Sequence, residues 1–135
     1  QKLTTGEEKA SAAMKLRTSG EDYLEAILVL QKEKWEVRPT DLAEHLGVSK
    51  PSVSRAVSLL RQGGFLKPDG AFLEFTAEGR DVAEKTYEKH CFFKAKLMEA
   101  GIDEQTAERE ACQMEHALSE ESFAKLKFLE RQEEV

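Results

Sequence analysis

Apolar residues recur at helical spacing from about residue 23 onward. Leu24 and Ile27 lie on the first clear apolar stripe, which predicts a helix that runs to about Lys32. Ser19 precedes an acidic pair and is expected to cap the start of this helix. Residues 1–18 are polar and lack a strong apolar stripe, so we expect them to form a frayed or helical extension.

Two further helices are expected to form a helix-turn-helix. Pro39 begins the first of them, and Gly47 ends it because a tight turn needs a positive φ. Ser49 is expected to cap the second helix, which stops at a pair of glycines. Val48 and Val53 are predicted to close the small core between the two helices.

The pattern then changes to strand-like spacing. Two short apolar runs, 65–67 and 71–75, flank Pro68-Asp69-Gly70, which predicts a β-hairpin. The order of helix, turn, helix and hairpin is typical of a winged helix-turn-helix. Thr76 is expected to cap a long helix that ends near Glu99.

Three short helices are expected after Gly101. Asp103 caps the first, the second runs from about Thr106 to Leu118, and Ser119 caps the third. The fold class is therefore predicted to be mainly α, with a winged helix-turn-helix DNA-binding domain followed by a helical domain. The expected boundaries are an extension at 1–18 and domains at 19–80 and 81–135.

Composition narrows the setting in which the chain works. Its 135 residues contain two cysteines, too few for a disulfide framework. No apolar run approaches the ~20 residues of a membrane span. We therefore expect a cytoplasmic protein with no membrane partner.

The net charge of −6 argues against nucleic-acid binding until its distribution is considered. Residues 45–68 carry four basic residues and no Asp or Glu, whereas residues 99–135 carry eleven acidic and four basic ones. The basic segment coincides with the predicted recognition helix and hairpin. Hydroxyl and cationic side chains there suit the major groove and its phosphates. The candidate DNA-binding residues are Thr40, Ser49, Lys50, Pro51, Ser52, Ser54, Arg55, Arg61 and Lys67.

Potential metal ligands occur on three other predicted helices. Cys112, Glu115 and His116 are spaced i, i+3 and i+4, which would bring thiolate, carboxylate and imidazole onto one helical face. Asp22 and Glu25 form an i, i+3 pair on the first helix, and His90 lies in the middle of the long helix. Each alone is more often a solvated or structural residue. Together they form a reasonable shell for a first-row divalent ion.

The combination resembles the diphtheria toxin repressor family of iron- and manganese-dependent regulators, especially its short manganese-transport-regulator branch. The resemblance covers about residues 19–130 and is carried by Glu21-Asp22-Tyr23-Leu24-Glu25-Ala26-Ile27, the helix-turn-helix, Leu73-Glu74-Phe75-Thr76, His90 and the block from Cys112 to Ser119. It implies a metal-dependent repressor that binds a palindromic operator as a homodimer and controls metal-uptake genes. The implied metal ligands are Asp22, Glu25, His90, Cys112, Glu115 and His116.

The resemblance also implies that the segment beyond about Glu108 supplies the dimer interface, which is consistent with its apolar residues Phe123, Leu126 and Leu129. Cys112 resembles the iron branch, whereas Asp22 resembles the manganese branch. We expect Fe(II) or Mn(II), with Co(II) or Zn(II) possible in vitro. Lys94 and Glu108 stand where iron-type members place ancillary ligands, and lysine is a poor ligand.

Two alternatives remain open at this point. A winged-helix regulator could respond to an organic ligand, or to an oxidant through Cys112 and Cys91. A di-metal carboxylate enzyme would be expected to show Glu-x-x-His pairs on two helices, and the chain has none. We therefore expect a regulator and no catalysis.

Overall fold

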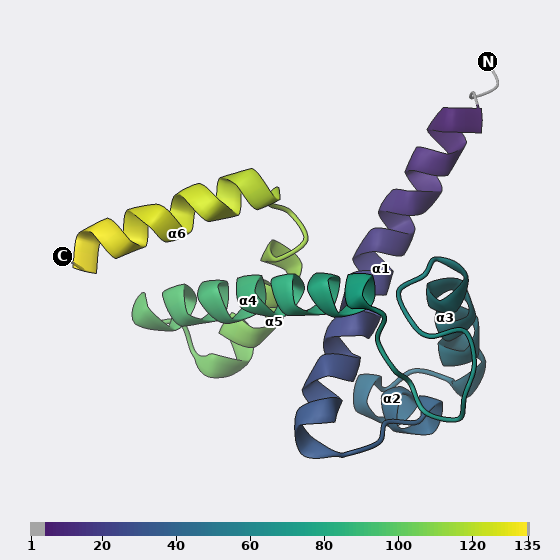
Figure 1. The fold of residues 1–135 in the computed structure, drawn as a ribbon. Helices are drawn as coiled ribbons and strands as arrows, with labels where there is room; N and C mark the ends of the chain where they lie inside the picture. Colours follow the sequence, from purple (N-terminus) through teal and green to yellow (C-terminus); the bar gives the residue numbers. More distant parts are fainter. Residues whose placement is uncertain (1–4, 135) are drawn as a thin grey trace. The chain divides into compact units, whose positions relative to one another are not determined.

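The computed structural model describes the backbone of residues 5–134 and the side chains of residues 19–133. The described chain forms six helices (Figure 1). They are α1 (Thr5–Glu33), α2 (Pro39–Leu46), α3 (Lys50–Gln62), α4 (Ala77–Glu99), α5 (Glu104–Met114) and α6 (Glu120–Glu134). The chain divides into two compact units, and the division between Lys85 and Thr86 falls within α4.

Helix α1 begins earlier than the sequence pattern predicted. It starts at Thr5 and continues through Ser19 to Glu33, so the prediction that Ser19 caps its start is wrong. The upstream segment contains Ala, Glu and Lys, which have high helix propensity, and no proline to stop a helix. Leu24 and Ile27 are buried as expected, and α1 packs against α2 and α3.

The helix-turn-helix forms at the predicted residues. Helix α2 begins at Pro39, and Gly47 follows it with a φ of 68°. The side chain of Ser49 accepts a hydrogen bond from the Ser52 backbone N–H at 3.2 Å and caps α3. Val53 is fully buried, but Val48 is 39% exposed, so the prediction that Val48 closes the core is wrong. Val48 lies in the turn, outside the inward-facing stripe of either helix.

The predicted hairpin is present in a reduced form. In the described chain it contains one antiparallel bridge, between Leu66 and Phe75. The Lys67 N–H donates to the Glu74 carbonyl at 2.9 Å, and the Leu73 N–H donates to the Val37 carbonyl at 2.7 Å. The segment before α2 therefore pairs with the returning arm of the hairpin, as expected of a wing.

Helix α4 begins as predicted, because Thr76 Oγ1 accepts a hydrogen bond from the Gly79 N–H at 3.1 Å. Asp103 likewise caps α5 through the Thr106 N–H at 3.1 Å. Thr106 is thus in the first turn of the helix that Asp103 starts. The expectation of separate helices here is wrong: α5 is one helix and ends at Met114, before the predicted Leu118.

The core of the second unit is aromatic. Phe123 of α6 is 2% exposed and packs edge-on against Phe92 of α4, with ring centroids 5.2 Å apart. Phe93 and Ala111 complete this core. Phe123 is therefore an internal residue of its own unit, whereas Leu126, Phe128 and Leu129 of α6 are exposed. Among the described helices, none is both long and apolar enough to cross a membrane.

Candidate metal centre and nucleic-acid interface

His90 is a buried residue at the centre of a polar cluster in the second unit. It is 8% exposed on α4, and its Nδ1 atom lies 2.9 Å from Oε2 of Glu115. Its Nε2 atom contacts Oε2 of Glu108 on α5. The packing of α4 against α5 thus places a carboxylate at each ring nitrogen.

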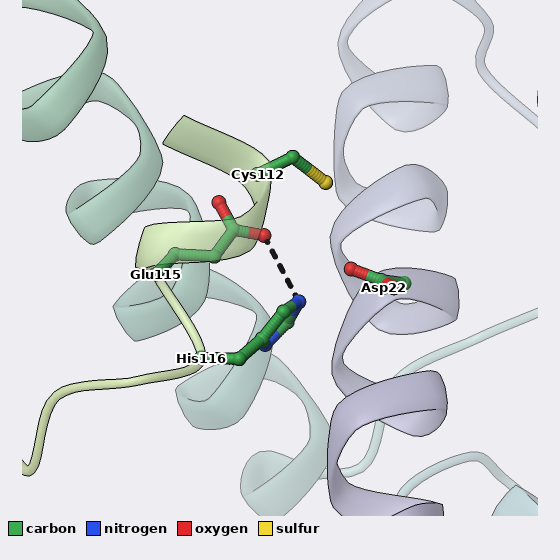
Figure 2. A group of neighbouring side chains, drawn as sticks. All are labelled: Asp22, Cys112, Glu115 and His116. Atoms are coloured by element: carbon green, nitrogen blue, oxygen red, sulfur yellow. Dashed lines mark ion pairs between the residues drawn. The ribbon is translucent and has the colours of Figure 1, made fainter. Parts of the chain in front are cut away.

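Three candidate ligands gather where α5 ends (Figure 2). Donor atoms of Cys112, Glu115 and His116 all lie within 4.8 Å of one another. Glu115 follows the last residue of α5, and its backbone N–H still donates to the Ala111 carbonyl. His116 lies in the turn beyond the helix, so the prediction that all three share one helical face holds only for Cys112 and Glu115. The turn nevertheless places His116 Nε2 3.4 Å from Glu115 Oε1.

Glu115 provides the test of whether this group fits a cation. Its side chain is buried, and its Oε1 atom accepts no hydrogen bond from any described residue. A buried carboxylate is costly unless positive charge compensates it. Thiolate, carboxylate and imidazole are together suitable ligands for a first-row divalent metal. The residues therefore fit such an ion.

Asp22 and Glu25 belong to the first unit. Both lie on α1 with partly buried side chains, one turn of the helix apart, and Figure 2 labels Asp22. Their spacing is that of two carboxylates on one helical face. That they bind one metal ion together with His90, Cys112, Glu115 and His116 stays a prediction.

Glu108 is a further member of the polar cluster that was not predicted as a metal ligand. It contacts His90, and its Oε1 atom lies 3.2 Å from Nζ of Lys94. Hydrogen bonding to Glu108 raises the pKa of Lys94 above its ordinary value, and burial opposes the shift. One signal was available: Glu108 precedes Glu115 by seven residues, two helical turns, and so shares its face.

The candidate DNA-binding side chains divide into two groups by exposure. Most are exposed on α2, α3 and the hairpin: Thr40, Ser49, Lys50, Pro51, Ser54, Arg55 and Lys67. Ser52 is half-buried and its hydroxyl accepts from that of Ser49 at 2.9 Å. Arg61 is also half-buried, and its Nη2 atom donates to the Gly70 carbonyl at 2.9 Å. Arg61 thus holds the hairpin tip against α3, while Lys50 and Arg55 project from the start and middle of α3.

Two family models match consecutive parts of the chain. Residues 15–70 match "Iron dependent repressor, N-terminal DNA binding domain". Residues 76–131 match "Iron dependent repressor, metal binding and dimerisation domain". The first range includes the helix-turn-helix and the first arm of the hairpin, and the second includes His90, Cys112, Glu115 and His116.

The chain is similar to transcriptional regulators of Methanocaldococcus jannaschii and Escherichia coli. The chain is 36% identical over 115 residues to the HTH-type transcriptional regulator MJ0568 of Methanocaldococcus jannaschii, covering 82% of this chain and 92% of that protein. It is 37% identical over 106 residues to the transcriptional regulator MntR of Escherichia coli O6:H1, covering 76% of this chain and 67% of MntR.

A solved structure, a manganese-dependent transcriptional repressor in complex with manganese, is 29% identical and superposes with a TM-score of 0.70. The match covers 78% of this chain and 49% of that one, so the chain spans about half the length of that repressor. The two consecutive domain matches and the identity to these regulators agree on one assignment. The chain belongs to the iron-dependent repressor family, with a winged helix-turn-helix DNA-binding domain followed by a helical metal-binding and dimerisation domain.

Proposed function

We propose that this chain is a metal-dependent transcriptional repressor that binds a palindromic operator as a homodimer. The observation that carries the proposal is the buried Glu115, with Cys112 and His116 beside it, in a chain whose other unit is a winged helix-turn-helix. A bound cation would compensate the charge of this buried carboxylate, so cation binding would stabilise the site. The homologous MntR and the solved manganese-dependent repressor support the same assignment.

The proposed ligands come from both units. Glu115, Cys112 and His116 bind the ion from α5 and the turn after it, and His90 binds or supports it from α4. Asp22 and Glu25 contribute carboxylates from α1. When bound, the ion supplies the positive charge that lets these acidic groups lie together. A bound ion would favour the dimer geometry that binds the palindromic operator.

The DNA-binding role falls to the exposed residues of α3 and the hairpin. Arg55 and Lys50 contact bases or phosphates of the major groove from α3. Lys67 contacts the DNA backbone from the hairpin. In a two-fold dimer the two α3 helices would reach half-sites about one DNA turn apart, ~34 Å. We place the protein in the cytoplasm, where it regulates metal-uptake genes and performs no catalysis.

The metal is proposed to be Fe(II) or Mn(II), with Co(II) or Zn(II) as substitutes in vitro. Carboxylate oxygens favour Mn(II), and the thiolate of Cys112 favours the softer Fe(II), Co(II) and Zn(II). Cys112 is thus the residue on which selectivity depends.

Selection from a pool of random DNA duplexes tests the proposal without a known operator. The full chain is incubated with the pool with and without Mn(II), and anaerobically with Fe(II). We expect a palindromic sequence to be enriched only with metal. The variant Glu115→Gln, which removes the buried charge with little change of volume, should enrich no sequence. The control Glu110→Gln, at a partly exposed position on α5, should behave as wild type. Equal enrichment without metal would refute the proposal.

Selectivity is tested by Cys112→Glu. Anaerobic titration of Mn(II), Fe(II), Co(II) and Zn(II) against the selected duplex compares this variant with wild type. We expect the order of potency to shift toward Mn(II). An unchanged order would show that Cys112 is not the selectivity ligand.

A further inference from the structure

A network of charged side chains joins α4 to α5 beside the proposed ligands. Nδ1 of His90 faces the buried Glu115 at 2.9 Å, and Nε2 faces Glu108. The second oxygen of Glu108 lies 3.2 Å from the ammonium group of Lys94. The proposed ligand Glu115 is therefore connected to Lys94 through the imidazole of His90 and the carboxylate of Glu108.

Lys94 is placed to act as a fixed positive charge. It follows His90 by one turn of α4, and its side chain is 28% exposed. Its hydrogen bond to Glu108 raises its pKa, so it remains an ammonium ion at neutral pH. An ammonium group has three donors and no lone pair, so it can neutralise Glu108 but cannot bind a metal.

The position of Lys94 matters because Glu108 and His90 are themselves potential ligands. A carboxylate and an imidazole nitrogen in contact form half of a typical divalent site. Lys94 supplies positive charge at this place without an ion. It also holds Glu108 on one side of the ring, which leaves the opposite nitrogen directed at Glu115.

We propose that the Lys94 ammonium group supplies positive charge to this network in place of a second metal ion, and that Lys94 is a positioning residue for His90. By holding Glu108 against Nε2, it orients Nδ1 toward Glu115 and prevents Glu108 and Nε2 from taking an ion of their own. The inference rests on the proposed function, because it takes Glu115 and His90 as metal ligands. It adds a residue that sets how tightly, and how many, ions the subunit binds.

Three variants separate these effects. Lys94→Gln removes the charge, and loss of an outer-shell partner typically lowers metal affinity about 10–100-fold. Lys94→Arg keeps the charge and should retain wild-type affinity. Lys94→Glu replaces the ammonium group with a carboxylate, which can bind a metal, so this variant should bind one additional ion per subunit.

A matched control is available on the same helix. Lys96 also lies on α4, and its Nζ atom pairs with Glu130 of α6 at 2.5 Å. The variant Lys96→Gln removes an inter-helix ion pair of the same kind without altering the His90 network. It should therefore bind metal as wild type does.

Anaerobic Co(II) titration of the metal-free chain measures affinity by calorimetry and the number of bound ions by native mass spectrometry. Thermal unfolding of each apo-variant establishes that it is folded. We expect Lys94→Gln to bind at least ten-fold more weakly than Lys96→Gln, and Lys94→Glu to gain an ion. Equal affinity of Lys94→Gln and Lys96→Gln, or no additional ion in Lys94→Glu, overturns the inference. In that case, metal binding by the wild-type chain would still support the proposed function. A wild-type chain that binds no ion refutes the proposed function, and the inference with it.

Discussion

Gly79 allows the start of α4 to pack directly on the backbone before the hairpin. It is buried in the first turn of α4. A Cβ atom at this position would lie 1.8 Å from the Phe65 carbonyl oxygen and 2.7 Å from its carbon, whereas real Cβ atoms essentially never come within 3.0 Å. The obstacle is backbone, so no side-chain rotation can relieve it. Gly79→Ala should therefore force α4 and residue 65 apart.

The cost of Gly79→Ala can be worked from the contacts at this point. Overpacking of a close contact costs about 1–3 kcal/mol. The Phe65 carbonyl also accepts from the Thr76 N–H at 3.2 Å, and loss of that hydrogen bond adds about 1 kcal/mol. Alanine regains up to about 1 kcal/mol through its helix propensity. The net expectation is a destabilisation of about 1–3 kcal/mol, opposite in sign to the usual effect of Gly→Ala in a helix.

Urea unfolding of the metal-free chain, followed by circular dichroism, measures this cost. Glu78→Ala, at the exposed neighbouring position, serves as the control and should change stability by less than about 0.5 kcal/mol. Operator affinity of Gly79→Ala should also fall, because the displaced segment leads into the hairpin. A Gly79→Ala variant as stable as wild type, or more stable, would refute the packing argument.

Three further predictions concern the aromatic core, the first turn of α2 and the recognition helix. Phe123→Ala should destabilise the second unit by about 3–5 kcal/mol in thermal unfolding. Phe128→Ala, at a 62% exposed position, should have little effect. Equal losses of stability in the two variants would show that Phe123 does not anchor α6. The hydrogen bond from Lys34 holds the pKa of Asp41 below its usual value of 3.8, so the Asp41 carboxylate stabilises the fold fully above about pH 4, and this contribution is lost as the pH falls through the lowered folded-state pKa. The unfolding free energies of wild type and Asp41→Asn should therefore converge under acid. A difference that stays constant with pH would contradict this. Arg55→Ala should weaken operator binding and, as a lost phosphate contact, reduce the salt-dependence slope by about 1; unchanged affinity and slope would remove Arg55 from the interface.

Local signals were sufficient for the helix-turn-helix. Pro39 and Gly47 mark the ends of α2, and Ser49 caps α3 through a neighbouring backbone N–H. These effects act over a few residues, so the sequence alone reveals them. The prediction that Ser19 caps a helix was wrong, because a residue that can cap a helix can also lie inside one when the upstream sequence favours a helix.

Contacts between helices could not be predicted in the same way. Helical spacing placed Cys112 and Glu115 on one face, but it does not reveal that Glu108 meets His90 eighteen residues earlier in the chain. That contact depends on how α4 and α5 pack. The burial of Phe123 is similar: its apolar character suggested a dimer contact, and only the packing of α6 on α4 identifies it as core.

The most direct test of the account is the affinity of the full chain for its selected duplex as free metal concentration is varied, measured by fluorescence anisotropy. A coupling of about 2–3 kcal/mol predicts that saturating Mn(II) or Fe(II) tightens binding about 30–150-fold. A chelator should reverse the effect, and Glu115→Gln should show none of it. Equal affinity with metal and with chelator would contradict the claim that this chain is a metal-dependent repressor.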